Sequence, residues 1–331
     1  MTLRAPYPYF GGKSRAAHLI WERFGDVANY VEPFAGSLAV LLARPTEPRI
    51  ETVNDLDCHI ANFWRAVQSD PDAVAKWCDW PVNEADLHAR HLWLVQGLPA
   101  HRERMLTEPD CFDAKIAGWW VWGICQWIGG GWCAERKPSR QLPHVGDAGM
   151  GVHRKLPHVG DAGMGVHRKL PHVGNAGMGV HRKLPHVGNA GRGGLFEDLT
   201  ARLRRVRVCC GDWSRVTGDS VTWRHGLTGL LLDPPYADPA QRSKDLYTND
   251  SLDVAHAVRE YAIENGDNPL MRIALCGYEG EHVMPASWEC VPWKAKGGYG
   301  GQSKDHDNPN AKRERIWFSP HCLGGKQRSL F

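Results

Sequence analysis

The apolar run Leu230-Leu231-Leu232, followed directly by Asp233-Pro234-Pro235-Tyr236, constrains the fold of this chain more than any other segment. Consecutive leucines predict a strand that is buried on both faces, as in a parallel sheet. The strand has to end at the prolines, because proline has no N–H with which to bond a neighbouring strand. Its end therefore presents a carboxylate, free backbone carbonyls and an aromatic ring. Such a strand end accepts hydrogen bonds from a donor amine and offers a flat ring for stacking.

Strands and helices alternate on either side of a long middle block. Up to about Ile60 the pattern predicts a loop, a helix, a strand, a turn and a second helix, and then a short strand, Ile50–Val53, that ends at Asn54-Asp55. In the third block we expect strands at Val206–Cys210, Leu227–Leu232, Arg272–Cys276 and Arg315–Phe318, and a helix near Ser251–Glu264. This alternation predicts a mostly parallel sheet with helices on both faces.

The middle block, about residues 61–194, begins with helical patterning. Its stretch Ile116–Ile128 carries Trp119, Trp120, Trp122 and Trp127, at a spacing that fits a buried helix face. Gly129-Gly130-Gly131 then ends the pattern. We therefore expect the tryptophans to serve core packing.

A 14-residue unit repeats at residues 142–191. It begins at Leu142, recurs at Leu156 and Leu170, and has a partial fourth copy from Leu184. Each copy is rich in glycine and has too few apolar residues for a solenoid core, which favours a flexible basic loop. Metal binding through the repeated histidines is the more specific alternative, although two histidines in a Gly-rich unit are a weak signal.

Positive charge is concentrated in this part of the chain. Thirteen Lys/Arg and five Asp/Glu lie between Ala134 and Arg205, although the whole chain has a net charge of only +3. A basic insert on a mildly acidic body is typical of an element that binds a polyanion. Composition alone favours the alternative, a solvated loop region.

Length and composition exclude several classes of protein. A chain of 331 residues that is 42% hydrophobic suits one large domain or a core domain with an insertion. No apolar run approaches the roughly 18 residues of a membrane span, and the start lacks the apolar stretch of a signal peptide. We therefore expect a cytoplasmic protein with no membrane partner. The ten cysteines contain no Cys-x-x-Cys pair, which predicts reduced thiols and no zinc site.

Two further segments have the character of a nucleotide site. Pro8-Tyr9-Phe10-Gly11-Gly12-Lys13 comes first, and Val31-Glu32-Pro33-Phe34-Ala35-Gly36-Ser37 follows a predicted strand. Small residues between a strand and a helix let a ligand approach the backbone at the helix N-terminus. Asp55, at the end of the next strand, has the usual place of a carboxylate that binds ribose hydroxyls.

Together with Asp-Pro-Pro-Tyr, these segments resemble the Dam-type (D12 class) adenine-N6 DNA methyltransferases, in the motif order of the alpha group. The resemblance covers the first 60 or so residues and about 195–318. It implies a Rossmann-like S-adenosylmethionine-dependent sheet with helices on both faces, formed by residues 1–60 and 195–320. It also implies an inserted target-recognition domain of helices and loops at 61–194, and residues 321–331 are expected to form a tail.

The resemblance also implies roles for individual residues. Cofactor contacts with S-adenosyl-L-methionine fall on Tyr9, Lys13, Phe34, Gly36, Asp55 and Asp233. For Phe34, plain core packing is the alternative. One position departs from the family pattern Phe-x-Gly-x-Gly: Leu38 stands where the second glycine is expected. This puts in question how closely the backbone approaches the methionine part of the cofactor.

The implied chemistry is methylation of an exocyclic amine, with Asp233, Pro234, Pro235 and Tyr236 as the catalytic segment. The adenine N6 lone pair is delocalised into the ring, so the nitrogen is a poor nucleophile. Asp233 and the Pro234 carbonyl would accept hydrogen bonds from its two hydrogens and stabilise the developing charge. Tyr236 would stack on the base, which must first be flipped out of the duplex. No metal is required.

Contacts with double-stranded DNA are expected from basic loops. Arg136, Lys137 and Arg140 suit phosphates or guanine edges. Lys244 lies in the polar run Ala237–Asp250, which we expect to form a loop over the target base. The run Lys294–Lys312 reads as a long hairpin loop between two strand-like segments.

Alternatives within the same chemistry are cytosine-N4 methylation and RNA adenine methylation, since both act on an exocyclic amine. A catalytically silent DNA-binding module is the alternative from a different class. By analogy we expect a solitary enzyme of phage or mobile-element origin rather than one partnered with a restriction enzyme in a restriction–modification system.

Overall fold

The computed structural model describes residues 3–7, 9, 11–127, 132–133, 195–236, 252–293 and 313–324. The helices are α1 (Ala17–Phe24), α2 (Ala39–Leu42), α3 (Cys58–Ser69), α4 (Pro71–Cys78), α5 (Glu84–Thr107), α6 (Ala114–Gln126), α7 (Leu195–Leu203) and α8 (Leu252–Asn265). The strands are β1 (Asn29–Glu32), β2 (Ile50–Asp55), β3 (Arg207–Cys210), β4 (Thr228–Leu232), β5 (Met271–Tyr278), β6 (Glu289–Pro292) and β7 (Glu314–Phe318). Each strand and helix expected between residues 206 and 318 is present, with bounds shifted by one or two residues.

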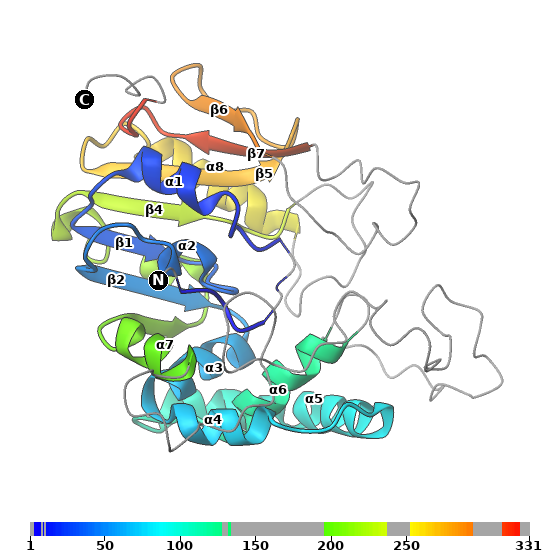
Figure 1. Cartoon of the computed structure of the whole chain (residues 1–331). Helices are drawn as coiled ribbons and strands as arrows, with labels where there is room; N and C mark the ends of the chain where they lie inside the picture. Colours follow the sequence, from blue (N-terminus) through cyan, green and yellow to red (C-terminus); the bar gives the residue numbers. More distant parts are fainter. Residues whose placement is uncertain are drawn as a thin grey trace.

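The described strands form one seven-stranded sheet in the order β3-β2-β1-β4-β5-β7-β6 (Figure 1). The first five pair in parallel, and β7 runs antiparallel to both β5 and β6. The chain builds the sheet outward in one direction from β1 and in the other from β4. The strand order therefore reverses between these two strands, where the carboxyl ends of an open parallel sheet bind ligands.

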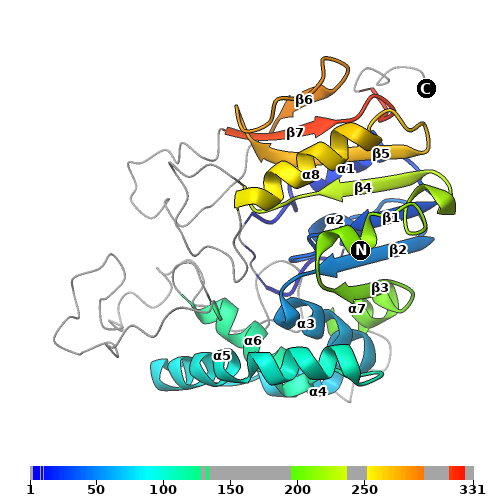
Figure 2. The ribbon, with the colours of Figure 1, turned by 180° about the vertical axis from the view of Figure 1, so that it is seen from behind.

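Alternate leucines of the predicted central strand face opposite sides of the sheet. Leu231 belongs to one core cluster together with α1, whereas Leu230 and Leu232 belong to a second cluster together with α8. Figure 1 shows α1 in front of the sheet, and the reverse view in Figure 2 shows α8 on the other face. A strand covered on both sides needs apolar residues at every position, which explains the unbroken leucine run.

The helices α3, α4, α6 and α7 extend the first core cluster beyond the β3 edge of the sheet (Figure 1). On α6, Trp120 and Trp122 are buried, and Trp119 and Trp127 pack partly buried against the same cluster. The expected packing role of the tryptophan-rich helix is thereby confirmed. The expected boundary at residue 60 falls inside α3, which contacts both β2 and β3.

A buried ion network joins α7 to strand β2 of the sheet. Glu51 of β2 accepts hydrogen bonds from Arg202 of α7, at 2.6 and 2.9 Å, and from Arg44, at 3.1 Å. The Glu51 and Arg44 side chains are almost inaccessible to solvent. Charged groups this deeply buried are stable only as partners, so α7 is held to one position on β2.

The repeats at 142–191, the basic residues Arg136, Lys137, Arg140 and Lys244, the runs 237–250 and 294–312, and the tail from residue 325 lie outside the described residues. Among the helices that are described, none is both long and apolar enough to cross a membrane.

Leu38 shows why a glycine is expected at its position. Its backbone is left-handed, with φ 53° and ψ 26°, and the residue stands immediately before α2. A left-handed conformation costs a non-glycine residue roughly 1–2 kcal/mol. The Leu38 side chain is wholly buried in the first core cluster, and burying a leucine contributes about 1.5–3 kcal/mol. The buried side chain thus offsets the backbone strain.

We expect Leu38→Ala to destabilise the protein by about 2–5 kcal/mol, because it removes buried atoms and keeps the strained backbone. Leu38→Gly should cost roughly 1 kcal/mol less than Leu38→Ala, since it also removes the strain. This order is the reverse of the usual preference for alanine over glycine near a helix. Urea unfolding of the two variants measures the difference, and a glycine variant less stable than the alanine variant contradicts the argument.

Candidate active site

The expected site residues gather at the carboxyl edge of the sheet. Gly36 follows β1, Asp55 ends β2, and Asp233 follows β4. Because β2, β1 and β4 are adjacent and parallel, their carboxyl ends meet at this edge. Lys13, from the segment before α1, reaches the same edge through a direct contact with Asp233.

Hydrogen bonds to both the N–H and the carbonyl of Gly36 hold the turn after β1 in place. Its N–H donates to Oδ2 of Asp55 at 2.9 Å. Its carbonyl accepts from Tyr7 Oη at 2.8 Å and from Trp64 Nε1 at 3.0 Å. The residue has φ +43°, and a Cβ there would lie 2.6 Å from Cε1 of Tyr9. A side chain at position 36 is thus excluded by both conformation and space, which fits a turn that must approach a ligand closely.

Asp55 is oriented by backbone donors. Besides Gly36, the N–H of Asp57 donates to its Oδ1 at 2.9 Å. Burial, reinforced by the Asp57 carboxylate, raises the pKa of Asp55 to about 7, although the two backbone hydrogen bonds act in the opposite direction. Each carboxylate oxygen accepts about two hydrogen bonds, so both retain an acceptor position for a hydroxyl donor.

Lys13 and Asp233 form a buried ion pair, with 2.8 Å between Nζ and Oδ2. Nζ also donates to the Gly11 carbonyl at 2.7 Å and lies 5.3 Å from the centre of the Tyr236 ring. The Lys13 side chain is 3% exposed and that of Asp233 20%. Burial alone lowers the pKa of Lys13, but Asp233 together with Cys276 and Glu314 more than compensates, so the net effect raises it. The lysine is therefore a fixed cation beside Asp233.

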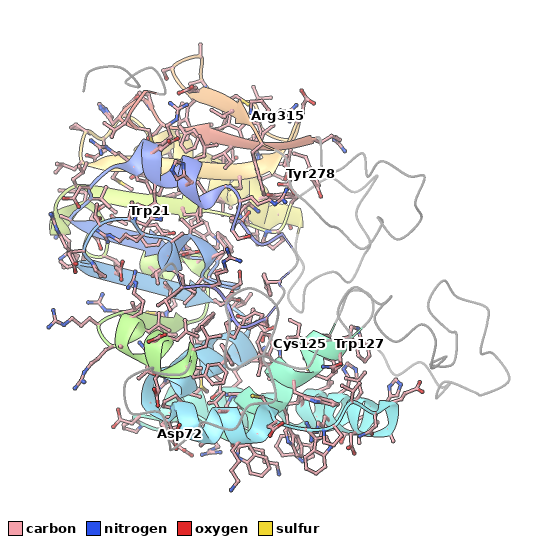
Figure 3. The ribbon with its side chains drawn as sticks, in the orientation of Figure 1. Trp21, Asp72, Cys125, Trp127, Tyr278 and Arg315 are labelled. Carbon is pink, nitrogen blue, oxygen red and sulfur yellow. The ribbon has the colours of Figure 1, made fainter. Side chains whose placement is uncertain are left out.

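Tyr236 is held by its hydroxyl and by its ring. Oη donates to Oε2 of Glu314 at 2.9 Å and lies 3.3 Å from Oδ1 of Asp233. The ring meets Tyr278 edge-on, with 4.6 Å between the centroids. Tyr278, labelled in Figure 3, ends β5, and its register partner Glu314 begins β7. Stacking of Tyr236 on a target base stays a prediction.

Sequence reasoning assigned no role to Glu32, which ends β1. The side chain is buried and accepts a hydrogen bond from Tyr30 Oη at 2.9 Å. Burial raises the pKa of Glu32 to about 8; the Tyr30 hydrogen bond opposes the shift, and the nearby Asp233 charge adds to it. The sequence did contain a signal for a role of Glu32 in the site, namely a carboxylate at a strand end directly before Pro33-Phe34.

Tyr7, Trp64 and Glu314 were also missed. Each belongs to the site through a single long-range hydrogen bond, to Gly36 or to Tyr236. Phe34, by contrast, is partly buried and packs against the second core cluster, as its alternative interpretation expected. Within the described residues all ten cysteines are free, and no group of three or more His, Cys, Asp or Glu side chains is arranged to hold a metal ion.

The seven-stranded, mostly parallel sheet flanked by helices is consistent with a Rossmann-like methyltransferase fold. Residues 9–86 match the family model described as D12 class N6 adenine-specific DNA methyltransferase. This part of the chain is therefore similar to that enzyme family, whose members use S-adenosyl-L-methionine as methyl donor. The match spans Tyr9, Lys13, Gly36 and Asp55 and ends before the Asp-Pro-Pro-Tyr segment. A comparison with curated protein sequences found no match.

The residues present fit this methyl donor. The Asp55 oxygens have acceptor positions left for the two ribose hydroxyls, and Gly36 keeps the turn free of a side chain.

We expect the affinity for S-adenosylmethionine to weaken as the pH falls through about 7. With a pKa raised to about 7, Asp55 gains a proton over this range, and the neutral carboxyl would lose an acceptor that is expected to bind the ribose. The loss should approach roughly tenfold per pH unit below the pKa. Calorimetric titration of the cofactor between pH 5.5 and 8.5 measures it. Asp55→Asn should bind weakly with a flat profile; a sloping profile in that variant assigns the dependence to another group, such as Glu32.

Proposed function

We propose that this protein is a site-specific adenine-N6 methyltransferase of double-stranded DNA, which transfers the methyl group of S-adenosylmethionine to the exocyclic amine of a flipped adenine. One observation supports the proposal: Asp233 lies at the same carboxyl edge of the sheet as the glycine turn and Asp55, where the strand order reverses. The acceptor for an amine and the expected cofactor residues therefore share one edge of one sheet.

In this proposal, the two oxygens of Asp233 have different tasks. Oδ2 is engaged by Lys13, which fixes the carboxylate plane. Oδ1 is left to accept one hydrogen of the adenine amine, and the Pro234 carbonyl accepts the other. Two acceptors favour a pyramidal nitrogen, whose lone pair then points toward the methyl group. The bound cofactor supplies that methyl group as an electrophilic sulfonium.

Charge explains why a carboxylate suits this position. The amine becomes positively charged as the methyl group is transferred, and Asp233 stabilises that charge more than it stabilises the neutral amine. Burial strengthens the effect, because the interaction is screened less than in water. Lys13 balances the negative charge of Asp233 within the site.

Recognition of the duplex is proposed for the insert at 61–194, with Arg136, Lys137 and Arg140 on the DNA and Lys244 near the flipped base. The net positive charge of residues 134–205 supports this role. We further propose a solitary enzyme, of phage or mobile-element type, without a restriction partner.

The test is a methylation assay with the full-length protein and radiolabelled S-adenosylmethionine, on double-stranded DNA, single-stranded DNA and RNA, followed by nucleoside analysis. We expect label in N6-methyladenine from duplex DNA. Label in N4-methylcytosine, or in RNA adenosine alone, supports the corresponding alternative chemistry. Protein that binds DNA and transfers no label to any substrate supports the silent module.

A further inference from the structure

The hydroxyl oxygen of Tyr236 lies close to one oxygen atom of each of two carboxylates. Tyr236 Oη lies 2.9 Å from Oε2 of Glu314 and 3.3 Å from Oδ1 of Asp233. Asp233 comes from the end of β4 and Glu314 from the start of β7, two strands away in the sheet. Glu314 is itself buried, so its carboxyl group is held in place rather than free in solvent.

A phenol hydroxyl has a single hydrogen to donate. Burial keeps Tyr236 protonated, because it raises the pKa of the phenol well above its ordinary value. The hydrogen therefore goes to one carboxylate or is shared unequally between the two. The shorter distance assigns it mainly to Glu314.

Lys13 occupies one acceptor position of Asp233 Oδ2, at 2.8 Å. If the Tyr236 hydroxyl turned its hydrogen to Oδ1, it would occupy one of the two acceptor positions of that oxygen and weaken its hydrogen bond to the substrate amine. Glu314 prevents this by accepting the hydrogen of the Tyr236 hydroxyl itself.

We propose that Glu314 is a positioning residue: it holds the Tyr236 hydroxyl away from Asp233 and so keeps Asp233 Oδ1 available to the target amine. The inference rests on the proposed function, because it assigns a partner to the amine acceptor of the same site. It adds a residue from the far end of the chain that neither the Asp-Pro-Pro-Tyr segment nor the family match includes.

The proposal predicts that Glu314 acts only through the Tyr236 hydroxyl. Glu314→Leu removes the acceptor, and Glu314→Gln leaves a neutral amide oxygen that competes less well than a carboxylate. With Tyr236 present, we expect the single-turnover rate of methyl transfer to fall about tenfold in the leucine variant and less in the glutamine variant, since one hydrogen bond is redirected. Cofactor affinity should stay unchanged. With Tyr236→Phe, which keeps the ring and removes the hydroxyl, the same substitutions should have little further effect.

The experiment measures single-turnover rates at saturating cofactor and DNA for all six combinations, with thermal unfolding to verify folding. Glu279→Gln is the matched control, because it removes a neighbouring exposed carboxylate that pairs with Arg315 instead. If Glu314→Leu fails to fold, the glutamine pair carries the test alone. Equal losses in the tyrosine and phenylalanine backgrounds overturn the positioning role while wild-type activity upholds the proposed function. A wild-type protein without methyl transfer overturns both.

Discussion

Asp233→Asn is expected to lower the rate of methyl transfer by about two to three orders of magnitude, the usual cost of losing one preorganised electrostatic partner of a transition state. The substituted amide keeps an oxygen acceptor near the amine but has no charge to balance the developing cation. The loss should therefore appear in the chemical step, measured by single-turnover transfer to duplex DNA.

Two controls separate this effect from unfolding. Lys13 retains the Gly11 carbonyl as an acceptor in the variant, so we expect the protein to fold with a lowered melting temperature. Its affinity for S-adenosylmethionine should fall far less than the rate, because Asp233 is only one of the expected cofactor contacts. Undiminished N6-methyladenine formation would remove Asp233 from the catalytic role and with it the proposed mechanism.

The sequence was sufficient to predict where the strands end. The leucine run, the prolines after Asp233 and the strand-end Asp55 each reflect a local rule, namely burial, loss of an N–H donor or strand termination. Since carboxyl ends of parallel strands meet at one edge, predicting the ends also predicted that these residues converge.

The partners of those residues were not predictable in the same way. Glu314 is 78 positions from Tyr236, and Tyr7 is 29 from Gly36, so no spacing rule connects them. The β5–β7 register alone brings Glu314 level with Tyr278, and thereby beside the Tyr236 ring. Such contacts depend on sheet register and on the packing of the side chains, which a local pattern does not specify.

Leu38 illustrates a different limit. The family pattern identified an unusual residue, and the left-handed backbone explains why glycine is expected there. The family pattern did not specify where the Leu38 side chain points. The side chain enters the core, and its burial offsets the backbone strain. Local conformation and tertiary packing oppose each other at this position, and packing prevails.

Lys13→Met is expected to be among the most destabilising substitutions in the site. It leaves the Asp233 carboxylate without its cation, and breaking a buried ion pair from one side costs about 3–5 kcal/mol. Because a fifth of the Asp233 side chain is exposed, the lower end of that range applies. Methyl transfer should fall as well, since the unpaired carboxylate is no longer held in its plane. Urea unfolding and single-turnover rates measure the two effects.

The double variant Lys13→Met/Asp233→Asn decides whether the ion pair serves stability or chemistry. Replacing both charges removes the unpaired charge and the desolvation cost together, so most of the lost stability should return. Activity should not return, because the carboxylate that the amine needs is still missing. A double variant that stays as unstable as Lys13→Met would mean that the ion pair itself stabilises the fold, whereas losses that simply add would mean that the two side chains are not coupled. Recovery of stability without activity instead indicates that the site retains two buried charges at no net gain in stability because methyl transfer requires an ionised Asp233.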